Sequence, residues 1–155
     1  GAGVSRGCNK LGIVVDVAHG TFDLVKRAAE VTGKPLVLSH TSLAGKPGPR
    51  SRQITADHAR LIADTGGVIG IWPVQAIFRN MKGYAGGFAR MVDAIGIDHV
   101  GLGSDMRGLT GPSLLDIYEA LPELTAALSA HGFNNEELGK LLGGNYRRVF
   151  TQTTG

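Results

Sequence analysis

Several features that would assign a function class at once are scarce in this sequence. Cys8 is the only cysteine, so no disulfide can form within the chain. Cysteine usage therefore does not indicate whether the protein works in an oxidising or a reducing compartment. Aromatic residues make up 6%, and no basic stripe is interleaved with them, which argues against nucleic acid as a partner. No apolar run approaches the length needed to span a bilayer. The small net charge of +3, with 43% hydrophobic and 19% charged residues, is typical of an ordinary globular protein.

Glycine, in contrast, is abundant. The 24 glycines are scattered singly or in pairs without a period, which excludes collagen and linker sequences. Scattered glycine is typical of a fold with many junctions between strands, loops and helices, because helix ends and tight loops require positive φ. The 155 residues suffice for a sizeable core, and no internal repeat or boundary divides them. We therefore expect residues 1–155 to belong to one domain.

Short apolar runs alternate with helical segments along the chain. The expected strands are residues 12–17, 35–38, 67–71 and 100–103. The expected helices lie within residues 22–31, 55–64, 83–96, 114–130, 136–142 and 146–150. Continuous apolar strands that alternate with helices are typical of α/β folds with a parallel sheet buried on both faces. Part of a (β/α)8 barrel and a small doubly wound sheet both fit, but the glycine motif of dinucleotide-binding folds does not follow the first strand.

Polar residues recur where the expected strands end. His19 follows the first strand, His40 the second and Asp105 the fourth. This end of the strands holds the active site in barrels and in open α/β sheets. Imidazole and carboxylate are the ligands expected for zinc or a similar divalent ion, which supplies hydroxide near neutral pH. Taken singly, each residue has a simpler interpretation as a hydrogen-bonding or capping group of its loop.

Four other polar residues have weaker claims to a site. Asp16 lies three residues before His19 and is a candidate for orienting an imidazole ring. His58 lies within a helix beside charged residues, on a face expected to be solvated. His99 precedes its strand, at the end opposite to the expected site. His131 lies in the last turn of a helix, where the helix dipole favours a cation.

Two residues are candidates for contacting a substrate. Arg52 belongs to a basic loop with Lys46 and Arg50, and a guanidinium is well shaped to hold a carboxylate. A solvated loop is the alternative, and it would be preferred without the neighbouring histidines. Trp72 follows the third strand, where it either lines a pocket or belongs to the core.

Five motifs, in order, resemble those of the membrane dipeptidase (renal dipeptidase) family, peptidase family M19. The first pairs VDVAH at 15–19 with LSHTS at 38–42, and their histidines are 21 positions apart. The others are RQITAD at 52–57, GGVIG at 66–70, DHVGLGSD at 98–105 and GGNYRRVF at 143–150. Together they cover almost the whole chain, so the resemblance is specific although each motif alone is weak.

The resemblance implies both a fold and an activity. The family is a (β/α)8 TIM barrel of the amidohydrolase type with a two-zinc centre. It hydrolyses dipeptides, and some members accept a D-residue at the C-terminal position or open β-lactams. Residues 1–155 would be the C-terminal half of such a barrel, a single partial domain of about four βα units with extra C-terminal helices. His19 and His40 would bind the second zinc.

Two further roles follow from the resemblance. Arg52 would hold the C-terminal carboxylate of the dipeptide substrate. Asp105 would handle the proton of the attacking water and of the leaving amine. Trp72 remains a candidate wall of the substrate pocket.

The chain also departs from the family pattern. No histidine is followed two residues later by aspartate, and no glutamate lies at a strand end, so the ligands of the first zinc and the bridging carboxylate are missing. We expect the chain to be truncated and to hold zinc poorly by itself. The stretch Met106-Arg107-Gly108 replaces the usual Phe-Asp-Gly, and Trp72-Pro73 replaces Asn-Phe. These two changes leave the substrate preference open.

Half a barrel leaves two sheet edges and much apolar surface uncovered. We therefore expect the chain to be a fragment of a longer product or to form a homo-oligomer. Three functions compete. The first is a zinc dipeptidase, the second a family member acting on another amide, such as a β-lactam or a peptide natural product, and the third a non-catalytic half-barrel module that binds a partner.

Overall fold

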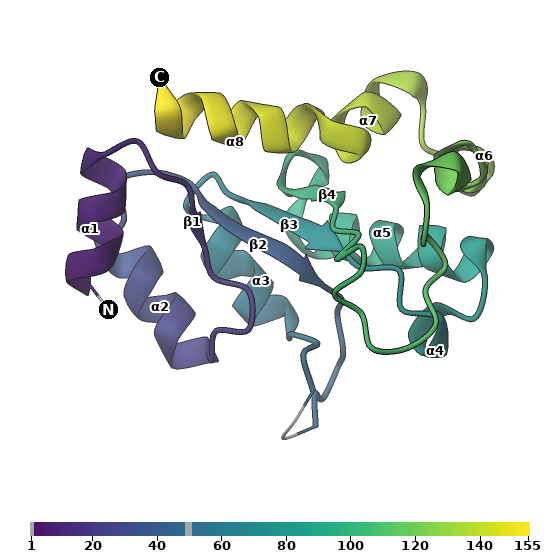
Figure 1. The fold of residues 1–155 in the computed structure, drawn as a ribbon, viewed down its shortest axis with the longest axis horizontal. Coiled ribbons are helices and arrows are strands. Elements are labelled where there is room, and N and C mark those ends of the chain that lie inside the picture. Colours follow the sequence, from purple (N-terminus) through teal and green to yellow (C-terminus); the bar gives the residue numbers. More distant parts are fainter. Residues whose placement is uncertain (1, 49–50) are drawn as a thin grey trace.

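A computed structural model describes residues 2–48 and 51–155. Within these residues, four parallel strands form one sheet in the order β1-β2-β3-β4 (Figure 1). The strands are β1 (Val15–Asp16), β2 (Leu36–Thr41), β3 (Val68–Ile71) and β4 (Val100–Leu102). The α-helices are α1 (Ala2–Lys10), α2 (Phe22–Val31), α3 (Ala56–Ala63), α4 (Gln75–Phe78), α5 (Met81–Ile95), α6 (Leu121–His131), α7 (Asn135–Gly139) and α8 (Asn145–Thr154).

Side-chain caps fix where the helices begin. Thr21 and Thr55 start α2 and α3, because each hydroxyl accepts a backbone N–H from the residue three positions later. Asn80 caps α5 in the same way, and Asn134 forms a capping box with Glu137 at α7. The helices before and after β2 in the chain, α2 and α3, both begin at the carboxyl edge of the sheet, next to the loops that follow β1 and β2.

One face of the sheet packs against a row of helices. Figure 1 shows α2, α3 and α5 side by side along this face. Burying aliphatic and aromatic side chains in this way is the main driving force for folding. The buried residues of this layer come from strands and helices alike: Val25, Leu36, Leu38, Ala59, Ile62, Ile69, Ile71, Phe88, Met91 and Val100.

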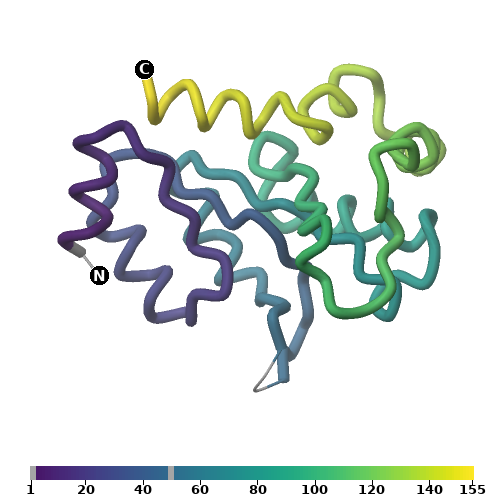
Figure 2. Tube along the Cα trace, viewed as in Figure 1, coloured from purple at the N-terminus to yellow at the C-terminus, as the bar shows by residue number. Residues whose placement is uncertain are grey.

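The opposite face carries a smaller apolar cluster beneath α8. Val37 and Val68 are partners across β2 and β3, and both pack with Val149 of α8. Arg148 donates hydrogen bonds to the carbonyl groups of Gly66 and Asp98, which lie two residues before β3 and β4. Figure 2 shows α8, in yellow, on the side of the molecule opposite to the loop that follows β2.

The predicted fold class is confirmed, with changes at the element ends. The first strand is shorter than expected, because residues 12–14 are not paired in the sheet and the chain turns after Val17. The last helix is longer, and α7 continues into it through a π-helical turn at Lys140–Gly144. No helix in the described part of the chain is long and apolar enough to cross a membrane.

Candidate functional site

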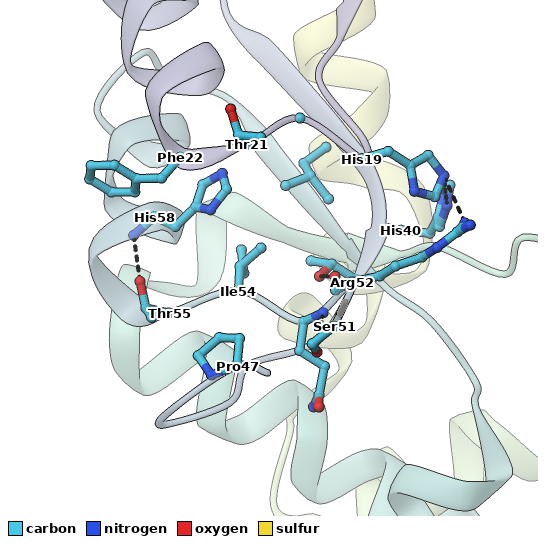
Figure 3. Close-up of a pocket in the computed structure, with 14 residues that line it drawn as sticks. His19, Thr21, Phe22, His40, Pro47, Ser51, Arg52, Ile54, Thr55 and His58 are labelled. Atoms are coloured by element: carbon cyan, nitrogen blue, oxygen red, sulfur yellow. Dashed lines mark hydrogen bonds between the residues drawn. The ribbon is translucent and has the colours of Figure 1, made fainter. Parts of the chain in front are cut away.

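His19 and His40 meet at the carboxyl edge of the sheet, where β1 and β2 end. Their Nε2 atoms lie 3.0 Å apart, and their rings stand edge to face with centroids 4.8 Å apart. Figure 3 shows both rings at one end of a hollow of about 550 Å³. Two imidazole nitrogens at this distance share either a proton or a cation, so the geometry suits a ligand pair.

A tight turn places His19 at this edge. The N–H of Gly20 donates to the carbonyl of Val17 over 3.0 Å, and His19 between them has a φ of +63°. Residues with a Cβ rarely adopt this conformation, and it persists only where the surrounding structure holds it. A Cβ on Gly20 would lie 2.9 Å from the Val17 carbonyl oxygen, so the turn requires glycine there.

His40 is oriented by the residue before it. Its Nδ1 lies 2.9 Å from the hydroxyl of Ser39. A ring that donates from Nδ1 to this hydroxyl keeps the Nε2 lone pair for a metal. Its side chain is 13% exposed, and its ring centroid lies 6.0 Å from that of Trp72.

Asp105 reaches the same place from the loop after β4. Its Oδ2 lies 3.7 Å from Nε2 of His40, and its side chain is 22% exposed. Asp105 also has a positive φ, of +45°, so it shares the strained backbone region with His19. The carboxylate thus faces the pair of imidazoles without displacing either ring.

The electrostatics favour a neutral His19. Loss of surrounding water lowers the pKa of His19, and the positive charge of Arg52 and the neighbouring His40 lower it further, while Asp105 and Asp16 act in the opposite direction. A lowered pKa keeps the imidazole unprotonated near pH 7, which is the form that binds a metal ion.

Arg52 approaches the histidines from the loop after β2. One guanidinium nitrogen lies 3.4 Å from Nε2 of His19. The loop is held to the strand because the hydroxyl of Thr41 donates to the Arg52 carbonyl over 2.8 Å. Of the other two basic residues of the loop, Lys46 does not line this hollow, and Arg50 lies outside the described residues.

Trp72 is buried, yet its ring also borders a cavity. Its indole N–H donates to the hydroxyl oxygen of Ser42 over 3.0 Å, and Gln53 donates to the same oxygen over 3.1 Å. A hollow of about 310 Å³ lies beside it, lined in part by Arg52 and Asp105. Trp72 therefore belongs to the core and also lines a cavity, the two positions that the sequence left open.

The whole chain, residues 1–155, matches the family model described as membrane dipeptidase (peptidase family M19). The chain belongs to the membrane dipeptidase family. Among sequence relatives, dipeptidase ataJ of Aspergillus terreus is 31% identical over 149 residues, which cover 91% of this chain and 36% of that protein. Dipeptidase 3 of Mus musculus is 29% identical over 150 residues, which cover 93% of this chain and 30% of that protein.

Solved structures of membrane dipeptidases have the same fold. The crystal structure of dipeptidase AC, a metallopeptidase, superimposes with a TM-score of 0.88 at 26% identity, covering 100% of this chain and 48% of that one. A metallopeptidase from Rhodobacter sphaeroides, liganded with a phosphinate mimic of the dipeptide L-Ala-D-Ala, gives 0.86 at 26% identity, covering 99% and 46%. The chain spans about half the length of these structures, which confirms the predicted half-barrel.

Membrane dipeptidases are metallopeptidases, so the donor set can be tested against a metal. Nitrogen ligands at about 2.0–2.1 Å from one zinc would subtend roughly 94° if separated as His19 and His40 are, somewhat below the tetrahedral angle. The pair therefore fits one divalent ion. Among the described residues, no group of three or more His, Cys, Asp or Glu side chains could hold a metal. The chain thus offers two ligands of a site that normally needs four.

The prediction that His58 lies on a solvated face is wrong. The histidine expected on a solvated helix face is buried, with 7% of its surface exposed, and its ring stands edge-on to Phe22 of α2. Its Nε2 has no hydrogen-bond partner among the described residues. Figure 3 places it on the wall of the hollow of about 550 Å³, at the end away from His19 and His40. Its charged neighbours in sequence concealed the burial, which depends on the packing of α2 against α3.

Proposed function

We propose that the complete protein is a zinc-dependent dipeptidase and that residues 1–155 supply one side of its active site. The observation that carries this proposal is the convergence of four side chains around two adjoining hollows: His40 from the end of β2, and His19, Arg52 and Asp105 from the loops after β1, β2 and β4. Two imidazoles, a carboxylate and a guanidinium are the groups that metal-assisted amide hydrolysis of an anionic substrate requires.

The residues divide the chemistry between them. His19 and His40 would hold a zinc ion, which polarises a carbonyl group and lowers the pKa of water. Asp105 takes a proton from the attacking water and delivers it to the amine nitrogen as the C–N bond breaks and the new C–O bond forms. Its oxygen, 3.7 Å from Nε2 of His40, lies close enough to the ligand pair to serve both steps.

Arg52 and Trp72 would position the substrate. The Arg52 guanidinium forms paired hydrogen bonds with the C-terminal carboxylate, which selects dipeptides over internal peptide bonds. Trp72 supplies a flat apolar wall next to that carboxylate. The hollow beside Arg52 and Trp72 would receive the C-terminal side chain, and a D-residue there matches the ligand described for the Rhodobacter relative.

The remaining metal ligands would come from protein outside this chain. The chain covers 48% of dipeptidase AC, and the described residues supply only two ligands. We infer that carboxylates from the other half of the barrel complete a two-metal centre and that residues 1–155 alone are inactive.

The test uses the complete protein. Metal content is measured by elemental analysis, and hydrolysis of Ala-D-Ala and Ala-L-Ala is followed before and after chelation. We expect bound zinc, chelator-sensitive turnover of dipeptides and at least a hundredfold loss of kcat in Asp105→Asn. A complete protein without metal or turnover would overturn the proposal and favour a non-catalytic binding module.

A second candidate substrate follows from Arg107. This residue stands where the family usually has aspartate, so it reverses the charge of a position that borders a hollow of about 260 Å³ next to Asp105. A cation there favours a substrate with an additional anionic group, as in some β-lactams or modified peptides. A substrate panel decides, because efficient turnover of plain dipeptides would argue against this alternative.

A further inference from the structure

Asp16 bonds to the residues that precede both candidate metal ligands. Its Oδ1 atom accepts a hydrogen bond from the N–H of Ala18 over 2.9 Å and another from the N–H of Ser39 over 3.1 Å. Ala18 directly precedes His19, and Ser39 directly precedes His40. The sequence suggested that Asp16 orients an imidazole ring, but both of these contacts go to the backbone.

The carboxylate replaces a missing bond of the sheet. In a regular parallel ladder, Val17 would donate to Val37 and accept from Ser39. Val17 does donate to Val37 over 2.8 Å, but its carbonyl accepts from Gly20 over 3.0 Å to close the turn that carries His19. The N–H of Ser39 is therefore free of its ladder partner, and Asp16 accepts it instead.

Ser39 links Asp16 to the second histidine, His40. The Ser39 backbone is held by Asp16, and the Ser39 hydroxyl lies 2.9 Å from Nδ1 of His40. One carboxylate oxygen thus fixes the turn that projects His19 and the strand end that projects His40. The hydrogen bonds are charge-assisted, which makes them stronger than bonds to a neutral acceptor.

We propose that Asp16 is the positioning residue that sets the separation of the His19 and His40 Nε2 atoms and so the metal affinity of the pair. It contacts neither the metal nor the substrate. The inference rests on the proposed function only in that the pair binds a metal. Groups around metal ligands commonly change metal affinity by about 10–100-fold, and the same range is expected for loss of the Asp16 oxygen.

Four variants of the complete protein separate positioning from folding. Asp16→Ala removes the acceptor, and Asp16→Asn keeps an oxygen without the charge. Asp16→Ser keeps a short acceptor for Ala18 but is too short to hold Ser39 as well. Asp93→Ala, an exposed aspartate on α5, is the matched control. Zinc affinity is measured by competition with a chromophoric chelator, the visible spectrum of the cobalt form reports ligand geometry, and the Tm of the metal-free protein reports folding.

We expect the zinc Kd to rise at least tenfold in Asp16→Ala and Asp16→Ser, with an altered cobalt spectrum. Asp16→Asn should stay within about threefold of the wild type, and Asp93→Ala should match it. A purely structural role would lower the metal-free Tm and leave Kd and spectrum unchanged, which overturns the proposal. If Asp16→Ala does not fold, Asp16→Ser decides between the same two outcomes. A wild-type protein that binds no metal refutes the proposed function instead.

Discussion

Gly108 lies directly against the carboxylate of Asp105, so a methyl group at position 108 would overlap Oδ1. Gly108 has no left-handed φ that would itself demand glycine. The glycine is therefore required by the position of the side chain beside it. A larger residue at position 108 must displace the Asp105 carboxylate from its present position beside His40.

Gly108→Ala should therefore reduce catalysis without removing the metal. We expect kcat to fall roughly 10–100-fold, because a displacement of about 1 Å at a reacting group costs on that scale. Steady-state kinetics and metal analysis of the complete protein check this. Gly111→Ala is the control, since a Cβ at position 111 of the same loop meets nothing within 4 Å. Equal loss of kcat in both variants would contradict a specific effect on Asp105.

His58 should make stability depend on pH. Burial lowers the pKa of His58 from its ordinary value of 6.5, so the folded state takes up a proton less readily than the unfolded chain. Its contribution to stability is present above pH 6.5 and is lost as the pH falls through the lowered folded-state pKa. Urea unfolding of the wild type between pH 8 and pH 5 should show this decline.

His58→Leu should remove that pH dependence. The change also eliminates a buried nitrogen that has no hydrogen-bond partner in the described part of the chain, so we expect the free energy of unfolding at pH 7 to rise by about 1 kcal/mol. The difference from wild type should widen toward pH 5. His131→Gln, at an exposed helix end, is the control. A variant as pH-sensitive as the wild type would show that other groups cause the decline.

Arg52→Lys should weaken substrate binding more than turnover. An ammonium cannot make the two parallel bonds of a guanidinium to a carboxylate, so we expect KM for a dipeptide to rise about tenfold or more with a smaller change in kcat. The corresponding dipeptide amide, which lacks the carboxylate, should be hydrolysed equally by both forms. Arg60→Lys, on the surface of α3, serves as control. An unchanged KM would exclude the carboxylate contact.

The Ser42 hydroxyl should couple the loop after β2 to Trp72. Ser42→Ala removes an acceptor shared by two donors, the buried indole N–H of Trp72 and the half-buried amide of Gln53, which keeps the Leu43 carbonyl as a second acceptor. Because the Trp72 donor is left without its acceptor, we expect a cost of about 1–3 kcal/mol in stability. Trp72→Phe removes one of those donors. In a double-mutant cycle the combined cost should be clearly smaller than the sum, and strict additivity would show that the bond carries no energy.

The sequence predicted the strand-end residues well because their position follows from the fold class alone. His19, His40 and Asp105 end up together since parallel strands all finish at one edge. Three features escaped prediction for one reason. The burial of His58, the backbone contacts of Asp16 and the placement of α8 each depend on how elements distant in sequence pack, and local pattern carries no signal for that. Site roles remain predictions until the variants above are measured.

The position of α8 has a consequence for synthesis of the protein. Val37 and Val68 lie on a sheet face that is covered by Val149, a residue 81 positions after Val68. At about 5–20 residues per second, the ribosome needs roughly 4–16 s to reach that position. During this interval the side chains of Val37 and Val68 lack the cover that Val149 gives them in the folded chain. A chaperone that recognises extended apolar segments would therefore find its binding site on the nascent chain, and lose it when α8 emerges.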